Sequence, residues 1–133
     1  MSQLTPELAY LFHLEKREED AVDDLQQNPF DVDAYFDRAW VSLQQGNYHQ
    51  AIDDFTAAIR LSESNPWTYL NRGEAHFRSG NFQKTIEDVN TAIALKANFI
   101  EAYLLRSDAR RRLGDEAGAI ADETKVHLLL SAQ

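Results

Sequence analysis

Charged side chains that recur at a fixed interval are the residues of this chain best suited to chemistry. Arginines lie 34 residues apart, and an aspartate follows each of them sixteen residues later. The pairs are Arg38 with Asp54, Arg72 with Asp88 and Arg106 with Asp122. If two antiparallel helices brought each pair together, it would form an ion pair that holds the helices in register. We therefore expect three structural ion pairs.

Other polar residues lack the spacing of a catalytic or metal-binding group. His49 and Asp53 share a helix face, but no third ligand accompanies them, so we expect an exposed polar pair and no metal. Neighbouring carboxylates such as Asp53 and Asp54 would diverge by about 100° on a helix, away from a shared acid/base site. The chain has no cysteine. We predict a protein that is not an enzyme and uses no cofactor.

Size and charge narrow the possible partners. The 133 residues are 44% hydrophobic, enough for one continuous core, and no stretch is long and apolar enough to span a membrane. Residues 1–37 contain ten acids and two bases, a net charge of −8 out of −9 for the chain. Nucleic acid and membranes are therefore poor candidate partners. The acidic segment is either a solvated helix face or a surface that attracts a basic partner. Without a recognisable leader, we expect a cytoplasmic protein.

The elements that would position these residues are helices arranged in repeats. Glycines at 46, 80 and 114 share the spacing of 34, and each precedes an asparagine or aspartate that can cap the next helix. A period of this length indicates a solenoid, whose units bury their apolar faces by stacking. The expected helices cover residues 6–27, 33–45, 48–61, 66–79, 82–96, 100–113 and 116–131.

The repeat resembles the tetratricopeptide repeat. Tyr35, Tyr69 and Tyr103 match the first aromatic of that motif, Ala39, Gly73 and Ser107 its small position, and Ala51, Phe55 and Ala58 its second helix. The resemblance implies an all-α, right-handed α-α superhelix of three helix hairpins, preceded by a long N-terminal helix. We expect a single domain over residues 1–133. Its parts would be a capping helix at 1–31 and repeats at 32–65, 66–99 and 100–133.

The resemblance also implies a binding site, because the first helices of such repeats line a concave groove that commonly holds a peptide. The matching positions are Phe36, Asp37, Trp40, Trp67, Asn71, Glu74, Arg78, Asp108, Arg111 and Arg112. Tryptophans on an accessible wall are typical anchors for a partner. Alternatively, Trp40 and Trp67 pack against each other or against the N-terminal helix. The arginine run could equally be ordinary charge at a helix C-terminus.

One known binding mode of the family can be tested on the sequence. Members that hold the free C-terminus of heat-shock chaperones use a lysine, two asparagines, a further lysine and an arginine at set groove positions. The equivalent positions here carry Phe36, Trp40, Asn71, Glu101 and Leu105. Only Asn71 matches, and Glu101 has the wrong sign for a carboxylate ligand. We predict that this chain does not use that mode.

The two ends of the chain suggest different roles. The apolar residues of the N-terminal helix are expected to face the repeats, with the segment 15–20 in water; they are Leu8, Leu11, Phe12, Val22 and Leu25. At the other end Val126 and Leu128, Leu129 and Leu130 place apolar groups on several sides of the last helix, which suits a homodimer, a missing further element or a frayed end. The predicted function is non-catalytic binding of a protein or peptide, as an adaptor, chaperone or assembly factor. The expected partner is a protein or peptide segment, with or without a basic stretch. The alternative is a scaffold that self-associates through its last helix.

Overall fold

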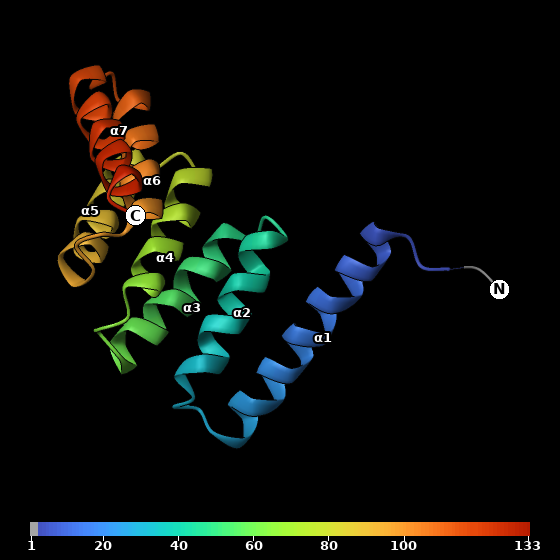
Figure 1. Cartoon of the computed structure of the whole chain (residues 1–133). Coiled ribbons are helices and arrows are strands. Elements are labelled where there is room, and N and C mark those ends of the chain that lie inside the picture. The colour runs from blue at the N-terminus through green and yellow to red at the C-terminus, as the bar shows by residue number, and fades with distance from the viewer. Residues whose placement is uncertain (1–2) are drawn as a thin grey trace. The chain divides into compact units, whose positions relative to one another are not determined.

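The computed structural model describes residues 3–133, and within that range the chain forms seven helices and no strands. Figure 1 shows them in chain order from blue to red. They are α1 (Pro6–Gln27), α2 (Val32–Gln44), α3 (Tyr48–Leu61), α4 (Pro66–Arg78), α5 (Phe82–Leu95), α6 (Ile100–Arg112) and α7 (Glu116–Ser131). Each boundary agrees with the sequence prediction to within one residue. The all-α fold class is confirmed.

Local side-chain chemistry explains where the helices begin. The Thr5 hydroxyl accepts a hydrogen bond from the backbone N–H of Leu8, and Pro6 occupies the first helical position, where its missing N–H costs nothing. Asn65 and Pro66 repeat this arrangement at α4. Asn81 caps α5 through the N–H of Lys84. These caps satisfy N–H groups that the helices leave unpaired at their starts.

Glycine ends the first helix of each hairpin. Gly46, Gly80 and Gly114 have φ values of 81°, 86° and 84°, in the left-handed region that other residues rarely adopt. The backbone then doubles back within two or three residues, so that α2, α4 and α6 each pack on the helix that follows. The period of 34 in the sequence therefore corresponds to a repeated helical hairpin.

The chain divides into two compact units, the first ending at Leu61 and the second beginning at Ser62. In unit 1, α2 lies between α1 and α3 and packs on both. Phe55 of α3 is fully buried, and Ala39, Ala51 and Ala58 are buried with it. Their small side chains let α2 and α3 approach closely.

Unit 2 contains α4 to α7, and each helix packs on the next. Its main apolar cluster consists of Leu70, Val89, Ala92, Phe99, Ala102 and Leu105. Close approach of α4 and α5 depends on Gly73, where an added Cβ would lie 3.4 Å from the Cβ of Asp88. The Thr85 hydroxyl crosses the same contact and donates to the Gly73 carbonyl at 3.1 Å. The helices α4 and α6 also touch directly, which matters for the site below.

The structure corrects the prediction for the N-terminal helix. Leu8, Leu11 and Phe12 were expected to face the repeats, but they are 51%, 53% and 60% exposed. The buried residues of α1 are Leu14 and Ala21, which lie on a different side of the helix, while Val22 and Leu25 are partly buried. The large apolar side chains of the first two turns misled the prediction, because α1 meets α2 along the side that carries Leu14 and Ala21. No helix in the described range is long and apolar enough to cross a membrane.

Candidate functional site

The repeated arginines and aspartates meet across each hairpin. Arg38 donates through Nε and Nη2 to the two carboxylate oxygens of Asp54, at 2.8 and 2.9 Å. The same two-pronged geometry joins Arg72 to Asp88 and Arg106 to Asp122, with the shortest bond of each pair at 2.7 Å. The aspartates are buried, whereas the arginine side chains keep partial access to water. Such paired, planar bonds are among the strongest charge-assisted hydrogen bonds.

Neighbouring side chains complete each ion pair. Gln50 donates to Asp54 at 3.0 Å, and Arg110 adds a second cation to Asp122 at 2.8 Å. Arg106 also donates to Asn90 of α5 at 2.8 Å, which ties two successive hairpins of unit 2. Hydrogen bonding to the aspartate raises the pKa of Arg38 above its ordinary value. The same cause raises the pKa of Arg72. Each bidentate pair thus joins the two helices of one hairpin.

His76 is the one histidine drawn into this network. Its Nε2 lies 3.8 Å from Asp88 Oδ2, and its side chain is almost fully buried in unit 2. Burial lowers the pKa of His76 below its ordinary value, although the Asp88 charge opposes the shift. A neutral imidazole is therefore favoured in the folded protein. No cluster of metal-ligand side chains occurs among residues 3–133.

In unit 1, the predicted groove residues are held by the N-terminal helix. Arg17 of α1 donates to Asp37 at 2.6 Å, and its guanidinium stacks 4.2 Å from the centre of the Trp40 ring. Phe36 packs edge-on against Phe55, with ring centres 5.5 Å apart. One cation thus holds both an acid and an aromatic of α2.

Sequence reasoning missed Arg17. The available signal was its position between Leu14 and Ala21 at helical spacing, on the side of α1 that meets α2. Arg17 is also one of only two bases within the acidic segment 1–37. A base on the packed side of a helix indicates contact with a specific acidic or aromatic side chain.

Unit 2 presents its predicted residues differently. Trp67 opens α4 and packs edge-on against Phe99, with ring centres 4.7 Å apart, while the Lys96 ammonium lies 5.1 Å from its ring centre. The tryptophan nevertheless stays 43% exposed. Its ring is therefore fixed by two neighbours while part of it remains open to a partner.

Helices α4 and α6 touch, and each carries a line of polar and apolar side chains that are at least partly exposed. We call these two lines together the α4–α6 face. It contains Trp67, Asn71, Glu74 and Arg78 from α4 and Leu104, Asp108 and Arg112 from α6. The spacing of three and four residues places each set along one side of its helix. Asn71 donates to the Trp67 carbonyl, and Arg78 pairs with Glu74 at 3.0 Å. Leu104 and Asp108 are exposed beside them.

The two arginines that end α6 have separate surroundings. Arg111 pairs with Glu116 and Glu123 of α7 at 3.1 and 2.6 Å, and these bonds raise the pKa of Arg111 and lower that of Glu123. Arg112 instead lies over the Phe77 ring, 5.6 Å from its centre. Only Arg112 therefore belongs to the α4–α6 face, and Arg111 fastens α6 to α7.

The last helix buries one side and exposes the other. Val126 is buried against the rest of unit 2, and Leu129 is partly covered. Leu128 and Leu130 are exposed, as is Ile120 earlier in the same helix. The four residues predicted for self-association are therefore divided between the core of unit 2 and its surface.

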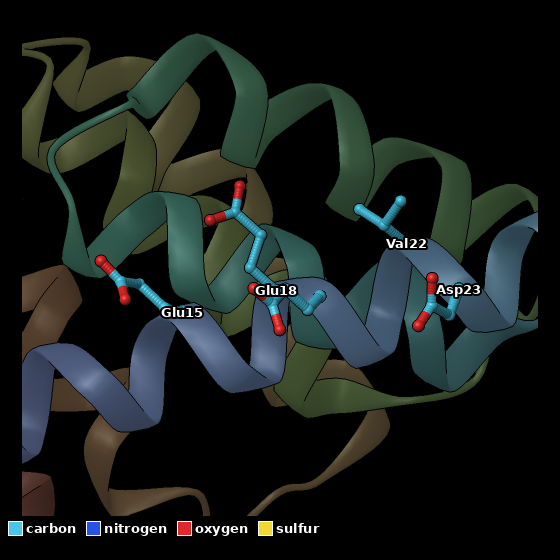
Figure 2. Close-up of a pocket in the computed structure, with 5 residues that line it drawn as sticks. Glu15, Glu18, Val22 and Asp23 are labelled. Atoms are coloured by element: carbon cyan, nitrogen blue, oxygen red, sulfur yellow. The ribbon is translucent and has the colours of Figure 1, made fainter.

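A pocket on α1 lies among acidic side chains. It is lined by Glu15, Glu18, Glu19, Val22 and Asp23, whose spacing places them on one side of the helix. Figure 2 shows Glu15, Glu18 and Val22 projecting from the same side of α1. Glu18 accepts a long hydrogen bond of 3.5 Å from Gln45. The acidic segment 1–37 thus carries a concentrated negative surface on α1.

Comparisons with known proteins point to one repeat family. A model described as TPR repeat matches residues 41–80, and one described as tetratricopeptide repeat matches residues 25–53. Among curated proteins, none matches the chain. The first TPR of Spaghetti (RPAP3), solved bound to the HSP90 peptide SRMEEVD, is 31% identical with a TM-score of 0.72. The match covers 74% of this chain and 78% of that one.

Two solved structures of MamA resemble the chain over more of its length. A crystal structure of MamA aligns with a TM-score of 0.84 at 18% identity, covering 97% of this chain and 75% of that one. MamA 41-end from Desulfovibrio magneticus RS-1 aligns with a TM-score of 0.87 at 22% identity, covering 95% and 71%. At these identities the likeness shows a shared fold of helical hairpins.

Proposed function

Because this chain belongs to the tetratricopeptide repeat family and is a protein-interaction module, we propose that it binds an extended partner segment on the α4–α6 face. The observation that carries the proposal is the state of Trp67. Phe99 and Lys96 fix its ring, yet 43% of the residue stays exposed. A rigid, half-open aromatic loses little entropy when a partner covers it, which is typical of an interface anchor.

The rest of the α4–α6 face suits a segment with an apolar anchor and a polar backbone. Leu104 supplies a second apolar contact on the adjoining helix. Asn71, Glu74 and Asp108 offer donors and acceptors at its sides, and Arg78 balances part of their charge. A face with nearly balanced charge selects by hydrogen bonding and shape rather than by long-range attraction.

The relative that binds an HSP90 peptide supports a peptide as the class of partner. Residues Phe36, Asp37 and Trp40, expected from the sequence to bind as well, have neighbours in unit 1 that already hold them. We propose that these three stabilise the packing of α1 on α2. The module would then serve as an adaptor or assembly factor that recognises a segment of another protein.

A random peptide library displayed on phage, selected against the purified chain, tests the proposal. Peptides selected by the wild type should lose at least about tenfold in affinity for Trp67→Ala and for Leu104→Ala, because each variant removes an anchor. Two matched controls exist: Phe30→Ala and Leu95→Ala remove an exposed aromatic and an exposed leucine outside this face. Selected peptides that bind all four variants equally would refute the α4–α6 face as the binding site.

Self-association through α7 is the second candidate function, and the exposure of Ile120, Leu128 and Leu130 favours it. Light scattering on the same purified samples measures the mass. A dimer that Leu128→Ser converts to a monomer would support the scaffold. A monomer at about 100 μM would remove it, since a functional scaffold should assemble at that concentration.

A further inference from the structure

We propose that one side of α1 is a second docking surface, which binds an amphipathic helix with apolar ends and an arginine- or lysine-rich centre. We call this surface the α1 outer face. It comprises Leu8, Leu11, Phe12, Glu15, Glu18, Glu19, Val22 and Asp23. The proposal is independent of the α4–α6 face, because it rests on different residues in the other unit.

The apolar side chains at the N-terminal end of the α1 outer face have little cover in the structure. Leu8, Leu11 and Phe12 are each more than half exposed, within five residues of one another. The packing of α1 on α2 is centred on Leu14 and Ala21, and of the α1 outer face only Glu18, which accepts a hydrogen bond from Gln45, and Val22 are partly covered. Clustered apolar side chains left in water in this way are typical of a protein interaction site.

The spacing along α1 specifies the shape of the partner. Leu8, Leu11, Glu15, Glu18 and Val22 follow one another at intervals of three and four residues, the pattern of a coiled-coil seam. The seam is apolar at both ends and acidic in the middle. A second helix is the element that fits such a seam, and it would span about four turns of α1.

The carboxylates of Glu15 and Glu18 determine which side chains the docked helix must carry at its centre. Figure 2 shows the Glu15 and Glu18 side chains on the side of α1 that lines the pocket, with Val22 following them. A helix docked on the seam would take both carboxylates further out of water, which is unfavourable unless cations pair with them. Arginine or lysine opposite Glu15 and Glu18 meets that requirement, while an apolar or acidic centre does not.

The same charge argues against a second copy of this chain as the occupant. Residues 1–37 have a net charge of −8, so two α1 outer faces brought together would oppose acid with acid. A basic partner is instead attracted from a distance and then seated by the leucines.

A labelled synthetic peptide of about three heptads tests the proposal by fluorescence anisotropy with the full chain. The peptide carries leucine at the four outer seam positions and arginine at the two central ones, which suits either helix direction. A matched peptide carries glutamate at the two central positions. We expect the wild type to bind the arginine peptide at least about tenfold more tightly than the glutamate peptide, with affinity falling as salt rises.

Paired variants of α1 locate the interaction. Glu15→Gln with Glu18→Gln, and separately Leu8→Ala with Leu11→Ala, should each weaken binding of the arginine peptide by about tenfold or more. Asp20→Asn with Asp24→Asn removes two carboxylates from other sides of the same helix and should change the affinity less than about threefold. Trp67→Ala should have no effect. Circular dichroism checks that each variant keeps its helices.

Three results would overturn the proposal. The first is failure of the wild type to prefer the arginine peptide, either because it binds both peptides equally or because it binds neither. The second is an equal loss of affinity in the Glu15/Glu18 and Asp20/Asp24 variants. The third is a wild-type dimer that Leu8→Ala with Leu11→Ala dissociates. The last of these would show that a second copy covers the face. A monomer that selects the arginine peptide through Glu15 and Glu18 would establish it.

Discussion

At the scale of residues, the three ion pairs are chemically alike but differ in how much depends on them. Asp122 holds both Arg106 and Arg110, and the Arg106 side chain is only 16% exposed. Asp54 holds one arginine, Arg38, which is 29% exposed and can turn toward water. Removing an acid therefore strands more buried charge at Asp122 than at Asp54.

We predict that Asp122→Ala lowers the free energy of unfolding by about 3–5 kcal/mol and Asp54→Ala by distinctly less. Urea denaturation followed by circular dichroism measures both. The double variant Arg106→Met with Asp122→Leu should recover much of the loss, because it leaves fewer stranded charges. Equal losses at the two aspartates, or no recovery in the double variant, would contradict a role for desolvated charge.

His76 makes the stability of the folded protein depend on pH, because its burial disfavours the protonated imidazole. Burial lowers the pKa of His76 below its ordinary value of 6.5, so the folded protein binds a proton less readily than the unfolded chain. Stability must then fall as the pH drops through about 6.5 toward the lower folded value. The charged groups that act on this imidazole are Asp88, Arg72, Lys84 and Glu87.

We predict that the wild-type protein loses more thermal stability between pH 7.5 and pH 5.5 than the His76→Gln variant does. Each of these pH values is about one unit from the ordinary pKa of histidine. Calorimetry measures the loss. His49→Gln, at an exposed histidine outside the network, should lose as much as the wild type. A His76→Gln variant with an unchanged pH dependence would show that another group causes it.

At the scale of elements, the sequence predicted the helices well because their ends have local causes. Glycines with positive φ and capping side chains act within a few residues, and both can be identified in the sequence. The orientation of α1 has no such local cause. Leu8 and Phe12 are more apolar than Ala21, but contact with α2 selects the side of the helix on which Ala21 lies. Which apolar side a helix buries depends on its neighbour, which the pattern of one helix does not reveal.

The candidate site shows the same limit. The resemblance identified the positions on α4 and α6, and their helical spacing placed them together. It could not foresee that Arg17 holds Trp40 or that Arg111 bonds to α7, because long charged side chains choose among several partners within reach. Position in a repeat thus predicts a backbone location better than the direction of a long side chain.

At the scale of the whole molecule, the charge of this chain disfavours the peptide that one of its relatives binds. The peptide SRMEEVD bound by the first TPR of Spaghetti has acidic residues at three of its last four positions. This chain carries a net charge of −9. At the three positions where the clamp would need cations it has Phe36, Glu101 and Leu105. Long-range repulsion and the missing cations at short range both lower the affinity of this chain for SRMEEVD.

We therefore predict no saturable binding of SRMEEVD to this chain at peptide concentrations up to about 1 mM, measured by isothermal titration calorimetry. The first TPR of Spaghetti serves as the positive control. Reversing the acidic residues of the peptide to lysine should restore attraction to the negatively charged chain, most strongly at low salt. Tight binding of the acidic peptide would mean that Asn71 and the remaining polar residues suffice without cations. Absence of binding together with capture of a basic helix would place the specificity of this module in its charge.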